Sequence, residues 1–334
     1  MGGGSSKKDG VVSRTKSKKI KEVHNLVLLG TGGAGKSTIF KAIKIAKKGG
    51  FTEHEREQHG IAIFRGLVKV MKGLLETVDE SSDSAASVKA ADLDALPEDT
   101  KQLREHLAAV WASDAIKAAF RENEGTENDP HEPSTRFIFK NFDRMNVAGF
   151  QSTDDDILQF RLPTTDFSTI DYDANDDVTL RFIDVGGQRK ERIKWNSLPE
   201  CTAVIFVAAL NDYNKKLAED ATRNRLHESI TLLRVLATKH FANTDIILFL
   251  NKRDLFEELI KTVDLKCCFM DYDGGCNYDP ALKRIVEGFK KVCADGDLHV
   301  NVTCATDINQ MDQTIQSMQE VVLKKLLNSF LDMS

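Results

Sequence analysis

The chain has 334 residues, of which 41% are hydrophobic and 29% are charged. This balance is typical of folded globular proteins and excludes a largely disordered chain. The length suggests about two domains. No apolar stretch is long enough to span a membrane, and the first residues lack the apolar core of a secretory signal. We therefore expect a cytosolic protein.

The net charge of −5 is unevenly distributed along the chain. Residues 1–21 carry seven Lys and Arg side chains against Asp9 alone, a charge of +6, which leaves −11 for the rest. The acidic body argues against nucleic acid as a partner, whereas the basic arm suits an anionic membrane surface. The cysteines lack CxxC pairing and histidines at metal spacing, so we expect free thiols at Cys201, Cys267, Cys268, Cys276, Cys293 and Cys304.

The first regular pattern is an apolar run at 26–29, which predicts a strand, followed by a glycine-rich turn and a helix from Lys36 to about residue 47. Later apolar runs predict buried strands at 178–184, 203–210, 246–251 and 299–303. Helical patterns lie between and after them, near 216–241, 280–292 and 309–330. Strands that alternate with helices predict a mainly parallel sheet covered on both faces.

Residues 50–155 have a different character. Apolar residues recur at helical spacing without strand signals, as in Phe64, Leu67, Val68, Met71 and Leu74. This pattern predicts an all-helical insertion. Its polar stretch from Ser81 to Thr100 is rich in Ser, Ala and Asp, which predicts an exposed, mobile loop.

The sequence GTGGAGKS at 30–37 fits GxxxxGK[ST] and lies between a predicted strand and a predicted helix. In such a loop the backbone N–H groups cradle phosphate oxygens, which assigns phosphate binding to Gly32, Gly33, Ala34, Gly35, Lys36, Ser37 and Thr38. Lys36 would reach the β and γ phosphates, and the Ser37 hydroxyl would bind Mg²⁺.

Asn251, Lys252 and Asp254 form the pattern NKxD directly after an apolar strand. The Asp254 carboxylate can accept hydrogen bonds from N1–H and N2–H₂ of guanine, and adenine would leave this acceptor unpaired. The pattern therefore favours GTP over ATP. A P-loop ATPase or kinase remains the alternative, since it would share Lys36 and Ser37 but would not need Asp254.

The third pattern is DVGGQ at 184–188. Asp184 ends a buried strand and would hold the outer shell of Mg²⁺, Gly187 would bring its N–H to the γ phosphate, and Gln188 would orient the attacking water. A fourth pattern, TCAT at 303–306, follows the last strand and would place Cys304 and Ala305 at the guanine, with the Ala305 N–H on O6.

These four motifs, in this order around a helical insertion, resemble heterotrimeric G-protein alpha subunits from about residue 23 to the end. DVGGQRKERIKW at 184–195 and CFMDYDGGCNY at 268–278 strengthen the resemblance. It implies that Arg161 is an arginine finger supplied in cis and that Thr164 is the second Mg²⁺ ligand after Ser37. It further implies a basic, membrane-proximal arm at 1–22, a Ras-like P-loop GTPase domain at 23–49 and 159–334, and an inserted helical domain at 50–158.

The family resemblance implies a switch that hydrolyses GTP to GDP and phosphate with Mg²⁺. Its expected partners are a beta-gamma dimer, a seven-helix receptor or other exchange factor, an RGS-type GTPase activator and an effector. Three alternatives stay open: a small-GTPase-like protein with an unrelated insertion, the ATPase or kinase, and a scaffold that binds GTP without turnover. Arg161 and Gln188 together argue against the scaffold.

The sequence also departs from the family pattern, because Gly33 and Ala34 stand where Glu and Ser are usual and Asp166 stands where Gly is usual. At the amino terminus, MGGGSS fits the signal for myristoylation of Gly2. One acyl chain anchors only marginally, so the lysine cluster would be the second signal. These features predict a location at the cytoplasmic face of the plasma membrane.

Overall fold

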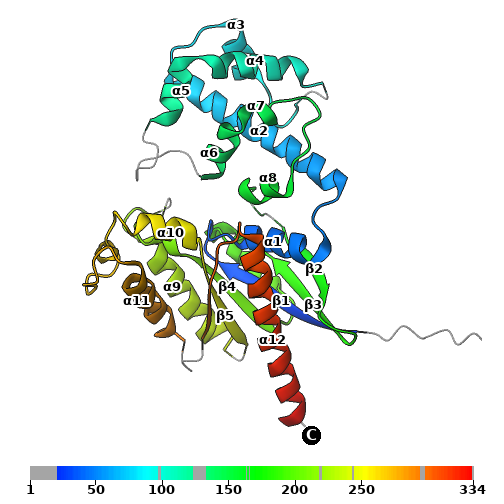
Figure 1. Ribbon diagram of the computed structural model, residues 1–334, viewed down its shortest axis with the longest axis vertical. Coiled ribbons are helices and arrows are strands. Elements are labelled where there is room, and N and C mark those ends of the chain that lie inside the picture. The colour runs from blue at the N-terminus through cyan, green and yellow to red at the C-terminus, as the bar shows by residue number, and fades with distance from the viewer. Residues whose placement is uncertain are drawn as a thin grey trace, which may run out of the picture.

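The computed structural model describes residues 21–96, 99–122, 133–162, 164, 166–217, 220–242, 244–293 and 298–332. The predicted Gly2 site and most of the basic arm lie outside these residues. Two parts are visible in Figure 1, a sheet with helices on its faces and a separate group of helices above it. This arrangement confirms the predicted fold class.

The sheet has six strands in the order β2-β3-β1-β4-β5-β6. Only the β2–β3 pair is antiparallel. The strands are β1 (Glu22–Gly30), β2 (Ser168–Asp173), β3 (Val178–Asp184), β4 (Ala203–Ala209), β5 (Asp245–Asn251) and β6 (His299–Val302). The four later apolar runs form β3, β4, β5 and β6, and each strand begins and ends within one residue of the predicted position. The edge strand β2 was not predicted.

Alternating side chains of β1 explain why the sheet is covered on both faces. Leu26 and Leu28 pack into the core that contains α1 (Lys36–Lys48) and α12 (Ile308–Asp332). Val27 and Leu29 point the other way, into the core that contains α9, α10 and α11. These helices span Arg225–Val235, Arg253–Leu259 and Tyr278–Lys290. Since both faces are covered, the carboxyl ends of the parallel strands remain as the edge where a site can form.

Helix α9 is shorter than the predicted segment 216–241. It begins at Arg225 because the Asn224 side chain caps it, accepting hydrogen bonds from the backbone N–H groups of Leu226 and His227. A π-helical turn, η3 (Leu236–His240), follows its last residue. Short 3₁₀ segments occur at η1 (Arg189–Ser197), η2 (Leu210–Asp212) and η4 (Leu265–Cys267).

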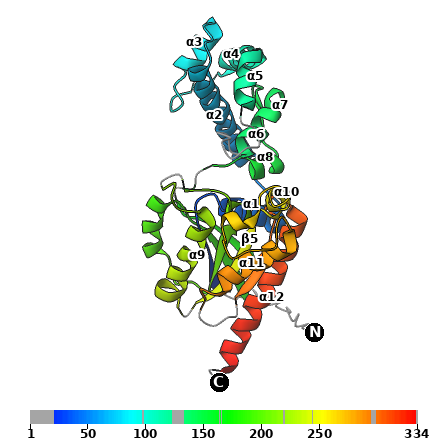
Figure 2. The same cartoon turned by 90° about the vertical axis from the view of Figure 1, so that its left-hand side faces the viewer.

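The helices α2 to α8 lie between α1 and β2 in the chain and form a separate group, which Figure 2 shows above the sheet. The long α2 (Glu53–Thr77) starts with a capping box between Thr52 and Glu55 and supplies the middle of the core. The others are α3 (Asp83–Ala90), α4 (Lys101–Ala112), α5 (Asp114–Arg121), α6 (Pro133–Lys140), α7 (Phe142–Met145) and α8 (Asp154–Gln159).

The prediction of a mobile loop from Ser81 to Thr100 was wrong for its first half. Ser82 caps α3, and Ala85 and Val88, three residues apart, are fully buried against the helical core. Two small apolar side chains are enough to pack this helix against the core, because it has only eight residues. Across the part of the chain that the structure describes, no helix is both long and apolar enough to cross a bilayer. The six cysteines are free, as predicted.

Candidate functional site

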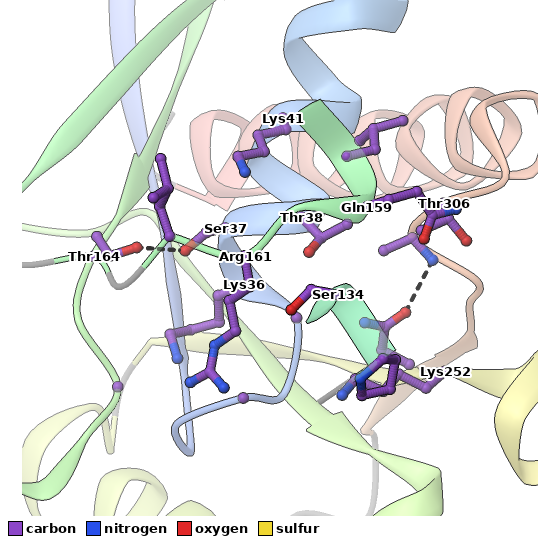
Figure 3. A pocket seen from close by; sticks show the side chains of 18 of the residues that line it. Lys36, Ser37, Thr38, Lys41, Ser134, Gln159, Arg161, Thr164, Lys252 and Thr306 are labelled. Atoms are coloured by element: carbon purple, nitrogen blue, oxygen red, sulfur yellow. Dashed lines mark hydrogen bonds between the residues drawn. The ribbon is translucent and has the colours of Figure 1, made fainter. Parts of the chain in front are cut away.

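A cavity of about 250 Å³ lies at the carboxyl edge of the sheet, between the two parts of the molecule. The loop from β1 to α1 forms its floor, and Ser134 of α6 and Gln159 of α8 reach it from the helical insertion (Figure 3). The sequence motifs therefore converge on one space. The predicted residues that line it are Gly32, Gly33, Gly35, Lys36, Ser37, Thr38, Arg161, Thr164, Gly187, Gln188, Asn251, Lys252, Asp254 and Ala305.

The amino terminus of α1 faces this cavity without a side-chain cap. Its N-cap residue is Gly35, and its first turn contains no acidic residue. The first N–H groups of a helix have no partner within the helix and carry a partial positive charge. An uncapped start of this kind favours an anion such as phosphate.

Lys36 is buried beneath the loop, and its ammonium group donates hydrogen bonds to the carbonyls of Gly30 and Thr31, both at 3.1 Å. Burial lowers the pKa of Lys36 to about 8, although the nearby Asp184 carboxylate acts in the opposite direction. Gly187 lies directly against this ammonium group, because a Cβ there would be 2.0 Å from Lys36 Nζ. Only glycine therefore allows this close approach.

Three oxygen-bearing side chains from three segments meet beside Lys36. Ser37 Oγ lies 2.5 Å from Thr164 Oγ1, and Thr164 Oγ1 donates to Asp184 Oδ2 at 3.3 Å. Asp184 is buried, which raises its pKa, and its Oδ1 has no hydrogen-bond partner among the described residues. A buried, unmatched carboxylate oxygen beside two hydroxyl groups fits a hard cation such as Mg²⁺.

Asn251 connects the phosphate loop with the loop that follows β6. Its Nδ2 donates to Ala34 O at 3.0 Å, and its Oδ1 accepts from Ala305 N at 3.0 Å and from the Thr303 hydroxyl at 3.3 Å. The Ala305 N–H, which was predicted to bind guanine O6, is thus donated to Asn251 in this structure. A guanine oxygen at this position would have to share that donor.

Lys252 follows Asn251 with φ of 63°, the one non-glycine residue with positive φ in the described ranges. Burial lowers its pKa to about 8, while Asp212 acts to raise it. Strained backbone of this kind persists where surrounding contacts fix it, often at a functional site. Asp254 lines the same cavity, and Cys304 is anchored beside it by a hydrogen bond from its N–H to Gln310.

The two predicted catalytic side chains lie close to the phosphate loop. A Cβ on Gly32 would be 3.2 Å from Gln188 Cγ, and one on Gly33 would be 3.9 Å from the guanidinium nitrogens of Arg161. Gln188 belongs to the segment after β3, and Arg161 follows α8. Arg161 and Gln188 are 27 positions apart in the sequence, yet they lie near neighbouring glycines of the same loop.

Two cationic residues at the site were not predicted. Arg225 donates to Gly32 O at 3.0 Å and pairs with the buried Asp212 at 3.2 Å. Lys41 lines the cavity from α1. Neither lies in a recognisable motif, and the helical periodicity around them gives no signal for a role in a site.

The sheet order, the loop around Lys36 and the cluster of Ser37, Thr164 and Asp184 define a P-loop protein of the Ras-like class with a helical insertion. A family model described as G-protein alpha subunit matches residues 5–322. The chain belongs to the G-protein alpha subunit family, which confirms the predicted resemblance.

The relatives are spread over distant organisms. The G(o) subunit alpha of Caenorhabditis elegans is 34% identical over 314 residues, which are 89% of this chain and 87% of that protein. The guanine nucleotide-binding protein alpha-2 subunit of Dictyostelium discoideum is 34% identical, with 93% and 91% covered. A guanine nucleotide-binding protein subunit alpha from Coprinellus congregatus is 32% identical, with 90% and 87% covered.

Proposed function

We propose that this guanine-nucleotide-binding alpha subunit hydrolyses Mg²⁺-GTP to GDP and phosphate and uses the reaction to time a signal. The observation that carries the proposal is the convergence of Lys36, Arg161 and Gln188 with the Ser37–Thr164–Asp184 cluster on one cavity. A protein that only bound nucleotide would not need Arg161 and Gln188 beside the phosphate loop.

Each residue at the cavity has its own role in the proposed reaction. Lys36 and the N–H groups at the start of α1 would bind the phosphates, and Gln188 would orient the attacking water. Arg161 would stabilise the charge that develops on the departing γ phosphate, a contribution of about 10³–10⁵ in rate among GTPases, G-alpha subunits included. Ser37, Thr164 and Asp184 would hold Mg²⁺, which neutralises phosphate charge when bound.

Guanine selection would come from Asp254, with Asn251 and Lys252 shaping the loop around it. Arg161 and Thr164 belong to the segment that enters β2, and Gly187 and Gln188 follow β3. Loss of the γ phosphate would release both segments, which is how hydrolysis would change the surface presented to partners. The proposed partners are the beta-gamma dimer, a receptor or other exchange factor, an RGS-type activator and an effector.

The proposed location is the cytoplasmic face of the plasma membrane. Support comes from the sequence alone, namely the myristoylation signal at Gly2 and the basic residues 7–21. Two weak attachments of this kind add to a stable one, since a single myristoyl chain binds only marginally.

The test is single-turnover hydrolysis by purified protein loaded with GTP, with Gln188→Leu as the variant. We expect the variant to keep GTP affinity and to hydrolyse GTP at least about 100-fold more slowly, because the water loses its orienting group. Competition by ATP for the loaded nucleotide is the control for base selection. Hydrolysis of GTP by Gln188→Leu at the parent rate would refute the assigned role, and ATP competing as well as GTP would refute the guanine site.

A further inference from the structure

Lys41 lies on α1, just over one turn after Lys36, and contacts the segment where the helical insertion returns to the sheet part. Its Nζ donates hydrogen bonds to the carbonyl oxygens of Ile157 at 2.9 Å and Phe160 at 3.1 Å. These carbonyls belong to the last turn of α8 and to the residue that ends it. Figure 3 shows Lys41 at the same cavity as Arg161, which is the next residue after Phe160.

The contact is chemically favourable. The last carbonyls of a helix have no N–H partner within it and carry partial negative charge, so a cation at this end satisfies and stabilises them. Lys41 is half-buried, and burial lowers its pKa to about 8 while the Asp184 carboxylate acts to raise it. The ammonium group is therefore largely protonated at neutral pH and can donate to both carbonyl oxygens.

The opposite end of α8 is held as well. Thr153 and Asp156 form a capping box, and Arg144 of α7 binds the buried Asp156 carboxylate. A six-residue helix with both ends bound is a rigid support for the backbone that leaves it. That backbone carries Arg161.

We infer that Lys41 is a positioning residue for Arg161. By holding Phe160 O, it fixes the point from which the Arg161 side chain extends toward the phosphate loop. The inference rests on the proposed hydrolysis and on the role of Arg161 in it. In catalysis a displacement of about 1 Å can cost about 100-fold in rate, so the loss of this support should be measurable.

The test uses full-length protein and the Lys41→Met variant, which keeps the length of the side chain but removes its donors. We expect the single-turnover hydrolysis rate to fall by about 10- to 100-fold, with the affinity for a non-hydrolysable GTP analogue changed by less than about threefold. Lys41→Arg keeps charge and donors and should restore most of the rate. The matched control is Lys44→Met, since Lys44 binds Glu55 and joins α1 to α2 at the other connection between the two parts. It should leave the rate near that of the parent.

The decisive step is a double-mutant cycle with Arg161→Ala. If Lys41 acts through Arg161, Lys41→Met should slow hydrolysis in the parent and have no further effect once Arg161 is absent. An equal loss in both backgrounds, or an equal loss in Lys44→Met, would overturn the inference in favour of a general structural role. If Arg161→Ala itself hydrolyses GTP at the parent rate, the proposed function fails at the same time. Thermal unfolding verifies each variant, and Lys41→Gln replaces Lys41→Met in the cycle should the latter not fold.

Discussion

At the scale of single residues, some polar side chains that line the cavity also form hydrogen bonds to the backbone of the loops around it. Asn251 is the clearest case, since it is 1% exposed and uses both ends of its amide. It binds Ala34 in the phosphate loop and Ala305 after β6. One side chain therefore couples the phosphate end of the cavity to the end that is proposed to bind the base.

Asn251→Ala should lower the free energy of unfolding by about 1–3 kcal/mol, because Ala34 O and Ala305 N lose their buried partner. The loss should appear in urea unfolding of nucleotide-free protein. Asp254→Ala is the control from the same loop and should change stability by less than about 0.5 kcal/mol, because Asp254 is exposed. Equal stabilities for the Asn251 and Asp254 variants would show that Asn251 contributes only through nucleotide.

Asp254→Asn tests base recognition. The amide can donate to the 2-oxo group of xanthine but cannot accept both guanine protons, so we expect GDP affinity to fall by about 100-fold or more and xanthosine diphosphate to bind instead. Equilibrium titration with both nucleotides measures this exchange. Unchanged GDP affinity would remove Asp254 from the recognition site.

The sequence predicted the residues whose chemistry is tied to a spacing, such as Lys36 in the phosphate loop and Asp254 in NKxD. It did not predict Lys41 or Arg225, which act on backbone carbonyls of distant segments. A carbonyl acceptor is present at every residue and leaves no trace in the sequence. Such contacts become visible only when the fold brings the segments together.

At the scale of elements, α8 shows how a short helix is stabilised by its ends. Burial acts to raise the pKa of Asp156, but hydrogen bonds from Arg144 and from Thr153 outweigh it and hold the pKa below its usual range. The ionised carboxylate therefore stabilises the fold above its unfolded pKa of about 3.9. This contribution is lost as the pH falls through the lower folded pKa.

Arg144→Met should destabilise the protein more than Asp156→Asn does, because it leaves the buried carboxylate without its cationic partner. A fully buried pair broken in this way costs about 3–5 kcal/mol, and we expect about 1–3 kcal/mol here because the Arg144 side chain is 46% exposed. Urea unfolding at pH 7 and at about pH 3, below the unfolded pKa of about 3.9, measures both variants. For each variant, the difference in the free energy of unfolding from the parent should be smaller at the lower pH. A difference that does not change with pH would contradict the proposed ionisation of Asp156.

The elements that sequence patterns predicted best are the buried strands and the long helices, since each has a continuous apolar signal. Helix α12 is an example, because Met311, Ile315, Met318 and Val322 are all buried at helical spacing. The small helix α3 and the edge strand β2 were missed. In β2 only Ile170 is buried, so the strand lacks the alternation on which a prediction depends.

At the scale of the whole molecule, two arginines from distant segments of the chain lie close to the phosphate loop. Gly33 has φ of 79°, and a Cβ there would be 2.9 Å from Arg225 Nη2 and 3.9 Å from the Arg161 guanidinium. Arg225 belongs to the sheet part, whereas Arg161 follows the last helix of the insertion. A carboxylate at this position would therefore lie between Arg225 of the sheet part and Arg161 at the junction with the helical insertion, and could pair with both.

Gly33→Glu should slow the spontaneous release of GDP, because the new carboxylate can pair with Arg161 and oppose separation of the two parts. A partly exposed pair contributes about 0–1 kcal/mol, so the expected change is at most several-fold. The positive φ strains any side chain, and Gly33→Gln provides the control with the same strain and no charge. GDP off-rates are then compared in backgrounds with Arg161→Ala and with Arg225→Ala. Slowing that disappears only without Arg161 would establish a latch between the parts, and slowing that disappears only without Arg225 would place the effect within the sheet part. Equal off-rates for the Glu and Gln variants would show that position 33 acts through loop conformation rather than charge.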